Sequence, residues 1–85
     1  MATVELYTKT TCGFCLRAKK LFDMKKVDYR EIAVDAGGKP REEMIQRAGG
    51  RSTVPQIFID GRHIGGCDSL MALEQDGKLD AMLAA

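Results

Sequence analysis

Residues 4–15 decide which fold this sequence favours; they read Val4-Glu5-Leu6-Tyr7-Thr8-Lys9-Thr10-Thr11-Cys12-Gly13-Phe14-Cys15. Polar and apolar residues alternate over residues 3–7, which predicts a short strand. After a polar loop at residues 8–11 the period changes, and the apolar residues that recur at helical spacing are Cys15, Ala18, Leu21 and Phe22. The stretch therefore predicts a strand, a loop and a helix, with Thr11 or Cys12 at or near the helix N-cap.

The rest of the chain predicts further strands and helices. Residues 56–60 are apolar at their centre, as in a strand buried on both faces, and Asp60-Gly61 is a strong hairpin signal. Pro40 suits the first turn of a helix. After the first helix, the predicted elements are a strand at 27–34, a helix from Pro40 up to Gly49, strands at 56–60 and 62–65, a helix from Asp68 up to Gly77 and a helical piece at 78–83. The order βαβαββα predicts an α/β fold, with helices flanking a four-stranded mixed sheet whose first two strands are parallel.

The composition is that of a soluble globular protein, and we expect a single domain over residues 1–85. Hydrophobic residues make up 45% of the chain and charged residues 29%, which excludes a disordered tail and a fibrous protein. A net charge of +1 offers no basic field to nucleic acid or to an anionic membrane. The first residues lack a basic stretch followed by an apolar one, so we expect no secretory signal and a cytoplasmic location. In that reducing compartment, three cysteines indicate reactivity or metal binding.

The cysteine pair carries the predicted chemistry. Cys12 lies where the polar loop meets the helix, and free backbone N–H groups and the helix dipole stabilise a thiolate there. Lys9 adds positive charge nearby. Cys15 is one turn further on and belongs to the apolar stripe, so we expect it to be the more buried thiol. We therefore predict that Cys12 is the attacking sulfur and Cys15 the resolving one.

The two cysteines have two alternative interpretations. They are core residues that happen to stand three apart, or they bind structural zinc together with His63 and Cys67. Their placement between a strand and a helix argues against the first alternative. The zinc alternative needs His63, which lies in the middle of a predicted strand, and Cys67, which lies beyond Gly65-Gly66. The gap between the first two ligands and these two also exceeds usual zinc-finger spacing. The sequence thus favours redox chemistry, and we expect no structural metal.

Four motifs give the chain a resemblance to a known family. In chain order they are Tyr7-Thr8-Lys9, Cys12-Gly13-Phe14-Cys15, Thr53-Val54-Pro55-Gln56-Ile57-Phe58-Ile59 and Gly65-Gly66-Cys67-Asp68. Their order and spacing resemble those of glutaredoxins of the small bacterial type, over essentially the whole chain. A lone CxxC is a weak signal, whereas a CxxC followed by TVP and GGCD is highly specific. The resemblance implies a thioredoxin-like fold and an enzyme of glutathione-dependent thiol–disulfide exchange.

The resemblance also implies a glutathione-binding site. Pro55 resembles the family's cis-proline, which turns the backbone of Val54 outward to pair with the cysteinyl part of glutathione as an added strand. Free N–H groups at the start of the third helix receive a carboxylate and Asp68 holds an ammonium, which together suit the γ-glutamyl end. Cys67 is implied to act through its backbone N–H, and Phe14 as an aromatic wall. The implied binding residues in these segments are Phe14, Thr53, Val54, Pro55, Gly66, Cys67 and Asp68.

The glycyl carboxylate of glutathione requires a cation, and two residues are predicted to supply it. Lys9 fits by its position after the first strand, and Arg41, at the start of the second helix, is the second candidate. The alternative for both is an ordinary solvated surface charge. Other residues of the implied site also have a structural role as the alternative to glutathione binding. Pro55 suits the start of a strand, Gly65-Gly66 suits a turn, and Asp68 suits a helix cap.

The active-site motif departs from that of many dithiol glutaredoxins, which carry Pro-Tyr between the cysteines. Gly13-Phe14 resembles instead the monothiol relatives, which have serine in place of Cys15. Gly13 loosens the turn that proline would fix. The motif is therefore compatible with two functions, disulfide exchange and cluster binding. The favoured one is reduction of protein–glutathione mixed disulfides and of protein disulfides by a monomer, in cell redox homeostasis. The alternative is a carrier of a [2Fe–2S] cluster, held in a dimer by two Cys12 sulfurs and two glutathiones.

Overall fold

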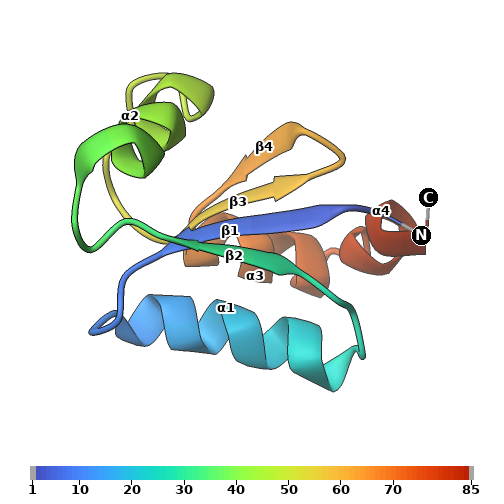
Figure 1. The fold of residues 1–85 in the computed structure, drawn as a ribbon. Coiled ribbons are helices and arrows are strands. Elements are labelled where there is room, and N and C mark those ends of the chain that lie inside the picture. The colour runs from blue at the N-terminus through green and yellow to red at the C-terminus, as the bar shows by residue number, and fades with distance from the viewer. Residues whose placement is uncertain (1, 85) are drawn as a thin grey trace.

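The computed structural model describes residues 2–84, which form four strands and four helices (Figure 1). In chain order these are β1 (Val4–Thr8), α1 (Gly13–Met24), β2 (Arg30–Ala33), α2 (Gly38–Arg47), β3 (Gln56–Ile59), β4 (Arg62–Gly65), α3 (Cys67–Gln75) and α4 (Leu79–Ala84). Every predicted element is present, including the short final helix. None of the helices in residues 2–84 is both long and apolar enough to cross a membrane.

The four strands form one sheet in the order β2-β1-β3-β4. β1 runs parallel to β2 and antiparallel to β3, and β3 runs antiparallel to β4. The parallel pair follows from the helical crossover through α1, and the β3–β4 pair from the turn at Asp60-Gly61. Both turn residues have positive φ, 51° and 79°, which is the geometry that favours Asp-Gly in a tight hairpin. The predicted four-stranded mixed sheet is thus confirmed.

Helices cover both faces of the sheet (Figure 1). α1, α3 and α4 pack on one face and α2 on the other. Because side chains alternate along a strand, Leu6 and Ile57 point toward α1 and α3, whereas Tyr7 and Phe58 point toward α2. The larger core contains Val4, Leu6, Ala18, Phe22, Ile57, Ile59, Leu70, Leu79 and Leu83, and the smaller one contains Tyr7, Val34, Met44, Ala48 and Phe58. The larger core fixes α1, the helix that follows the first cysteine, to the sheet.

Three elements begin at residues clearly different from those predicted: β2, α3 and α2, the last of which starts at Gly38 and not at Pro40. β2 starts at Arg30, whereas the sequence predicts a strand from residue 27. The chain turns through Lys26, with a φ of 58°, and the N–H of Val27 donates to Phe22 O at 3.0 Å instead of pairing with β1. Val27 is apolar because it packs against the larger core. α3 begins one residue early with Gly66 as its N-cap, so Asp68 stands in the first turn and is not the capping residue.

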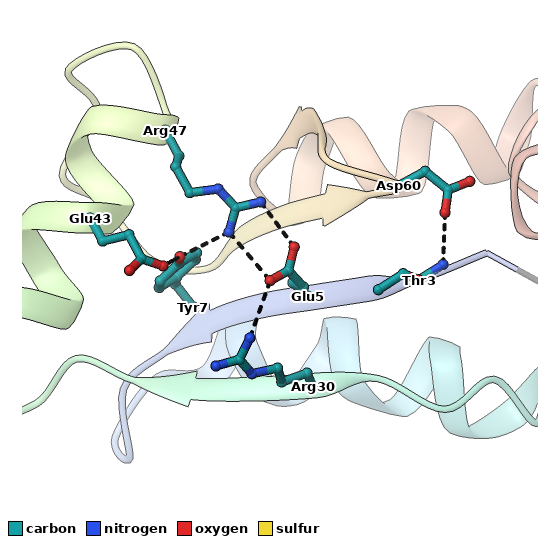
Figure 2. A network of polar contacts seen from close by, with 7 residues as sticks. All are labelled: Thr3, Glu5, Tyr7, Arg30, Glu43, Arg47 and Asp60. Carbon is teal, nitrogen blue, oxygen red and sulfur yellow. Dashed lines mark hydrogen bonds and ion pairs between the residues drawn. The ribbon is translucent and has the colours of Figure 1, made fainter.

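A polar cluster joins α2 to β1 (Figure 2). Arg47, the last residue of α2, donates hydrogen bonds to Glu5 Oε1 and to Tyr7 Oη, both at 2.9 Å. Its guanidinium carbon also lies 4.1 Å from the ring centroid of Phe58. Tyr7 Oη in turn donates to Glu43 of α2. We call Glu5, Tyr7, Glu43 and Arg47 the Arg47 cluster; its bonds tie α2 to its face of the sheet.

Candidate active site

Cys12 caps the first helix. Its backbone is extended, with φ −110° and ψ 110°, and α1 begins at the next residue. The backbone N–H of Cys15 donates to Cys12 Sγ over an N–S distance of 3.1 Å. The Cys12 thiol also donates to Val54 O, 3.8 Å away. The Cys12 sulfur is thus partly exposed and accepts an N–H at the start of a helix.

Cys15 is buried, with 1% of its surface exposed. Burial is the main cause that raises the pKa of Cys15, to about 12, and its hydrogen bond with the Cys12 side chain is the next. Cys15 therefore remains a neutral thiol at neutral pH. The two sulfurs differ in exposure in the direction that the sequence predicts, whereas their roles in attack and resolution stay predictions.

A pocket lies beside Cys12, between the start of α1, the loop before β3 and the start of α3. Its lining residues are Phe14, Arg51, Thr53, Val54, Pro55, Gly66, Cys67, Asp68 and Ser69, and we call it the cysteine pocket. The structure thus brings together the seven residues that the resemblance implies in these three segments. The Val54–Pro55 peptide bond is cis, as the resemblance implies. Binding of glutathione by these residues remains a prediction.

Two glycines stand where β4 leads into α3, next to the cysteine pocket. Gly65 has a φ of 117°, a conformation that residues with a Cβ rarely adopt, and a Cβ there would lie 2.8 Å from Ser69 Oγ, which would have to shift. A Cβ at Gly66 would lie 3.4 Å from Pro55 O. Gly66 is the N-cap of α3 and offers no side-chain cap, so the first N–H groups of the helix keep their donor capacity. The pocket therefore contains backbone donors beside the carboxylate of Asp68.

The cation in the cysteine pocket is Arg51, and neither Lys9 nor Arg41 lines it. Lys9 lines a separate polar hollow beside β2, and Arg41 is exposed on α2. Binding of the glycyl carboxylate of glutathione by Lys9 or Arg41 therefore remains a prediction for a position outside this pocket. The Arg51 guanidinium lies 3.3 Å and 4.0 Å from the Cβ positions that Gly65 and Gly66 lack. Within residues 2–84 it makes no ion pair with a carboxylate.

Sequence reasoning assigned no role to Arg51. The available signal is its position two residues before Thr53, in the loop that carries the TVP motif. That position makes Arg51 a neighbour of the pocket along the chain. Whether its side chain turns toward α3 depends on contacts with residues more than ten positions away, which the sequence does not reveal.

The structure gives no support to the zinc alternative. Within residues 2–84, no three His, Cys, Asp or Glu side chains gather closely enough to bind a metal ion. His63 instead bonds through Nε2 to Gln56 Oε1 at 2.6 Å and packs on the ring of Phe58. Cys67 is 5% exposed, and burial raises the pKa of its thiol. Cys67 is therefore a packed neutral thiol at the start of α3.

The fold and the cysteine pair together define the class of protein. The molecule is a thiol–disulfide oxidoreductase with a thioredoxin-like fold, because a helix-capping cysteine follows the first strand and lies against the loop of a cis-proline. The family model described as Glutaredoxin matches residues 4–64. The chain therefore belongs to the glutaredoxin family.

Individual relatives agree with this assignment. The chain is 57% identical to Glutaredoxin 3 of Escherichia coli K12 over 83 residues, which cover 98% of this chain and 99% of that protein. It is 51% identical to a glutaredoxin of Pseudomonas aeruginosa over 85 residues, the full length of both. Among solved structures, a buckwheat glutaredoxin–glutathione complex superposes with a TM-score of 0.86 at 41% identity, covering 98% of this chain and 77% of that one. The predicted family, fold and enzyme class are thus confirmed.

Proposed function

We propose that this glutaredoxin reduces mixed disulfides between proteins and glutathione, with protein disulfides as a second class of substrate. The observation that carries the proposal is the geometry of Cys12, whose partly exposed sulfur accepts a helix N–H beside the cysteine pocket. In this proposal the protein is a monomer of one domain and works in the cytoplasm, where the glutathione pool is kept reduced.

Each turnover consists of two thiol–disulfide exchanges. The Cys12 thiolate attacks the glutathione sulfur of the mixed disulfide; a Cys12–glutathione bond forms, and the protein thiolate leaves and takes a proton from water. A free glutathione thiolate then attacks the glutathione sulfur bound to Cys12, which releases oxidised glutathione and restores the Cys12 thiolate. The net reaction converts the mixed disulfide and one glutathione thiol into the protein thiol and oxidised glutathione, so one disulfide bond is broken and one is formed. Cys15 provides a second route, in which it loses its proton and displaces glutathione to form a Cys12–Cys15 disulfide.

Glutathione fits the cysteine pocket by charge and by backbone. Val54 presents its main chain beside Cys12, where the cysteinyl part of an extended peptide can pair with it. The γ-glutamyl carboxylate would meet the free N–H groups at the start of α3 and the guanidinium of Arg51. Its ammonium would meet Asp68, and Phe14, 56% exposed, would cover the peptide from α1.

The second carboxylate of glutathione, at its glycyl end, needs a cation outside this pocket. The backbone N–H of Lys9 bonds to Cys15, which places this residue beside the cysteine pair. A tripeptide that extends past Cys12 would bring its glycyl carboxylate toward Lys9. Arg41 is the second candidate, supported only by its place in the sequence.

The proposal is tested by following reduction of a glutathionylated peptide in the presence of glutathione, glutathione reductase and NADPH. We expect NADPH oxidation that depends on this protein and saturates with glutathione. Free cysteine at the same thiol concentration is the matched control, since it lacks the γ-glutamyl and glycyl groups. Because its disulfide is not a substrate of glutathione reductase, the two reductants are compared by direct measurement of the released peptide thiol, and we expect far slower turnover with cysteine. Equal rates with both reductants, or none with either, would overturn the proposal.

The second candidate function is binding of a [2Fe–2S] cluster. The observation in its favour is Gly13, where a side chain would meet no atom within 4 Å, so the space next to Cys12 is open. Cys15 is buried, and residues 2–84 contain no group of three metal ligands, so one chain alone does not fit a cluster. Two chains would each supply Cys12, and two bound glutathiones would supply the remaining thiolates that a cluster requires.

Anaerobic reconstitution with iron and sulfide tests this second function. Visible absorption and gel filtration are measured with and without glutathione. A coloured dimer that forms only with glutathione is the expected result. A colourless monomer under both conditions would refute the cluster function, and the oxidoreductase function would be the only one that remains.

A further inference from the structure

A fully buried glutamine stands directly after the cis-proline. Gln56, the first residue of β3, is 0% exposed, and its amide reaches back to the loop that lines the cysteine pocket. Its Nε2 donates to Thr53 O at 2.9 Å and to Thr53 Oγ1 at 3.1 Å. Burial of an amide is costly unless all of its polar atoms are bonded, so these contacts determine where the side chain lies.

The oxygen of the same Gln56 amide bonds to a histidine of the β3–β4 hairpin. His63 Nε2 lies 2.6 Å from Gln56 Oε1. A carbonyl oxygen such as Thr53 O only accepts, which orients the Gln56 NH₂ toward Thr53 and the amide oxygen toward His63. His63 must therefore carry its proton on Nε2 to donate this bond. Burial and the charge of Arg51 lower the pKa of His63, which favours the neutral ring.

His63 is itself held in place. Its ring packs on Phe58, with centroids 5.1 Å apart and planes inclined by 32°. Phe58 is buried in the smaller core, and β4 pairs with β3 at this position. A chain of hydrogen bonds thus runs from the β3–β4 hairpin through Gln56 to Thr53, which lines the cysteine pocket.

We propose that Gln56 is a positioning residue for the glutathione site, which holds Thr53 and thereby the main chain of Val54 beside Cys12, with His63 as its anchor. The expected change in KM for glutathione rests on the proposed function. Gln56 does not line the pocket, so it acts only through Thr53. Without its two donors, the carbonyl and hydroxyl of Thr53 lose their partners, and the loop can adopt conformations in which Val54 no longer matches an extended peptide.

Gln56→Met tests the proposal, because methionine has nearly the same length and volume but neither donor nor acceptor. We expect the KM for glutathione to rise about 3- to 10-fold, the value of one or two neutral hydrogen bonds, with kcat little changed. His63→Phe keeps an aromatic ring on Phe58 and removes only the anchoring donor. We expect it to raise the KM for glutathione in the same direction by about twofold.

Ile59→Val, which trims the buried core at the far end of β3, is the matched control for lost stability. It should lower the melting temperature without altering the KM for glutathione. A Gln56→Met variant that lowers only the melting temperature, or lowers kcat at unchanged KM, would overturn the positioning role.

A second measurement does not depend on activity. Backbone NMR order parameters of Thr53 and Val54 should fall in Gln56→Met and stay unchanged in Ile59→Val. Unchanged order parameters in Gln56→Met would refute the positioning role. If the unaltered protein shows no glutathione-dependent turnover, the proposed function fails, and the order parameters alone decide whether Gln56 holds the loop.

Discussion

The Arg47 cluster and the cysteine pocket use polar groups in opposite ways. In the cluster, each charged or hydroxyl group has a partner within the protein: Arg47 bonds Glu5 and Tyr7, and Tyr7 bonds Glu43 (Figure 2). In the pocket, α3 begins without a side-chain cap, and within residues 2–84 Arg51 makes no ion pair. Groups that are satisfied internally add to folding stability, whereas unsatisfied donors are available to a ligand.

Burial sharpens this difference. Tyr7 is fully buried, and burial, followed by its bond to Glu43, raises the pKa of its hydroxyl. The bond to Glu5 is the main cause that raises the pKa of Arg47, so this guanidinium keeps its charge over the whole physiological range. In the pocket, Phe14 and the sulfur of Cys12 are partly exposed. Changes in the pocket should therefore affect glutathione chemistry, and changes in the cluster should affect stability.

The largest effect is expected at Cys12. Cys12→Ser removes the only partly exposed thiol among residues 2–84 and should abolish reduction of a glutathionylated peptide, since a serine hydroxyl does not form a comparable nucleophile. Cys15→Ser should retain much of the activity, because glutathione itself can release Cys12. Turnover of both variants is measured on the same peptide. An equal loss in the two variants would show that attack and resolution are wrongly assigned.

The next effect is expected at the start of α3. Asp68→Ala should remove the charge-assisted contact that we propose with the ammonium of glutathione, worth about 1.5–3 kcal/mol or roughly 10- to 150-fold in kcat/KM for glutathione. Asp76→Ala, at the other end of the same helix, is the control and should leave the kinetics unchanged. Thermal melts accompany both measurements. If Asp68→Ala lowered only the melting temperature, its carboxylate would serve the helix and not the substrate.

The Arg47 cluster should respond in stability and not in turnover. Arg47→Met leaves Glu5 and Tyr7 without their donor and should lower the free energy of unfolding by about 1.5 kcal/mol, measured in urea. Arg30→Met removes a second arginine from Glu5, but one that is 75% exposed and 3.7 Å away, so a loss below about 0.5 kcal/mol is expected. Equal losses, or a change in kcat/KM for glutathione larger than the change in stability, would remove the contrast between the two regions.

The smallest effect concerns the buried thiol of Cys15. The pKa of Cys15 is about 12 in the folded protein against an ordinary value of 9.0, so the unfolded thiol ionises first as the pH rises. Its contribution to stability is therefore complete below pH 9 and is lost above it, by about 1 kcal/mol between pH 9 and 10. Urea unfolding under reducing conditions should show this slope in the unaltered protein and a shallower one in Cys15→Ala. Parallel slopes would mean that Cys15 ionises equally in both states.

Sequence alone was sufficient for the features that depend on neighbouring residues. The change from alternation to helical spacing around Cys12 predicted β1 and α1, and Asp60-Gly61 predicted the hairpin, because turns and amphipathic faces are local properties. The order of these elements predicted a mixed sheet with a parallel first pair and an antiparallel hairpin, whereas the pairing of β1 with β3 came from the structure. Spaced motifs then identified the family and named seven residues that the fold gathers around one pocket.

Only the tertiary structure decided which of the remaining polar residues meet. Many exposed cations of this chain look equivalent in the sequence, yet Arg51 turns into the cysteine pocket while Lys9 and Arg41 do not line it. Glu5 and Arg47 are 42 positions apart, and their pairing depends on how α2 lies across the sheet. The bond between Gln56 and His63 depends likewise on the register of the hairpin. Such contacts follow from packing of distant segments, for which local periodicity carries no signal.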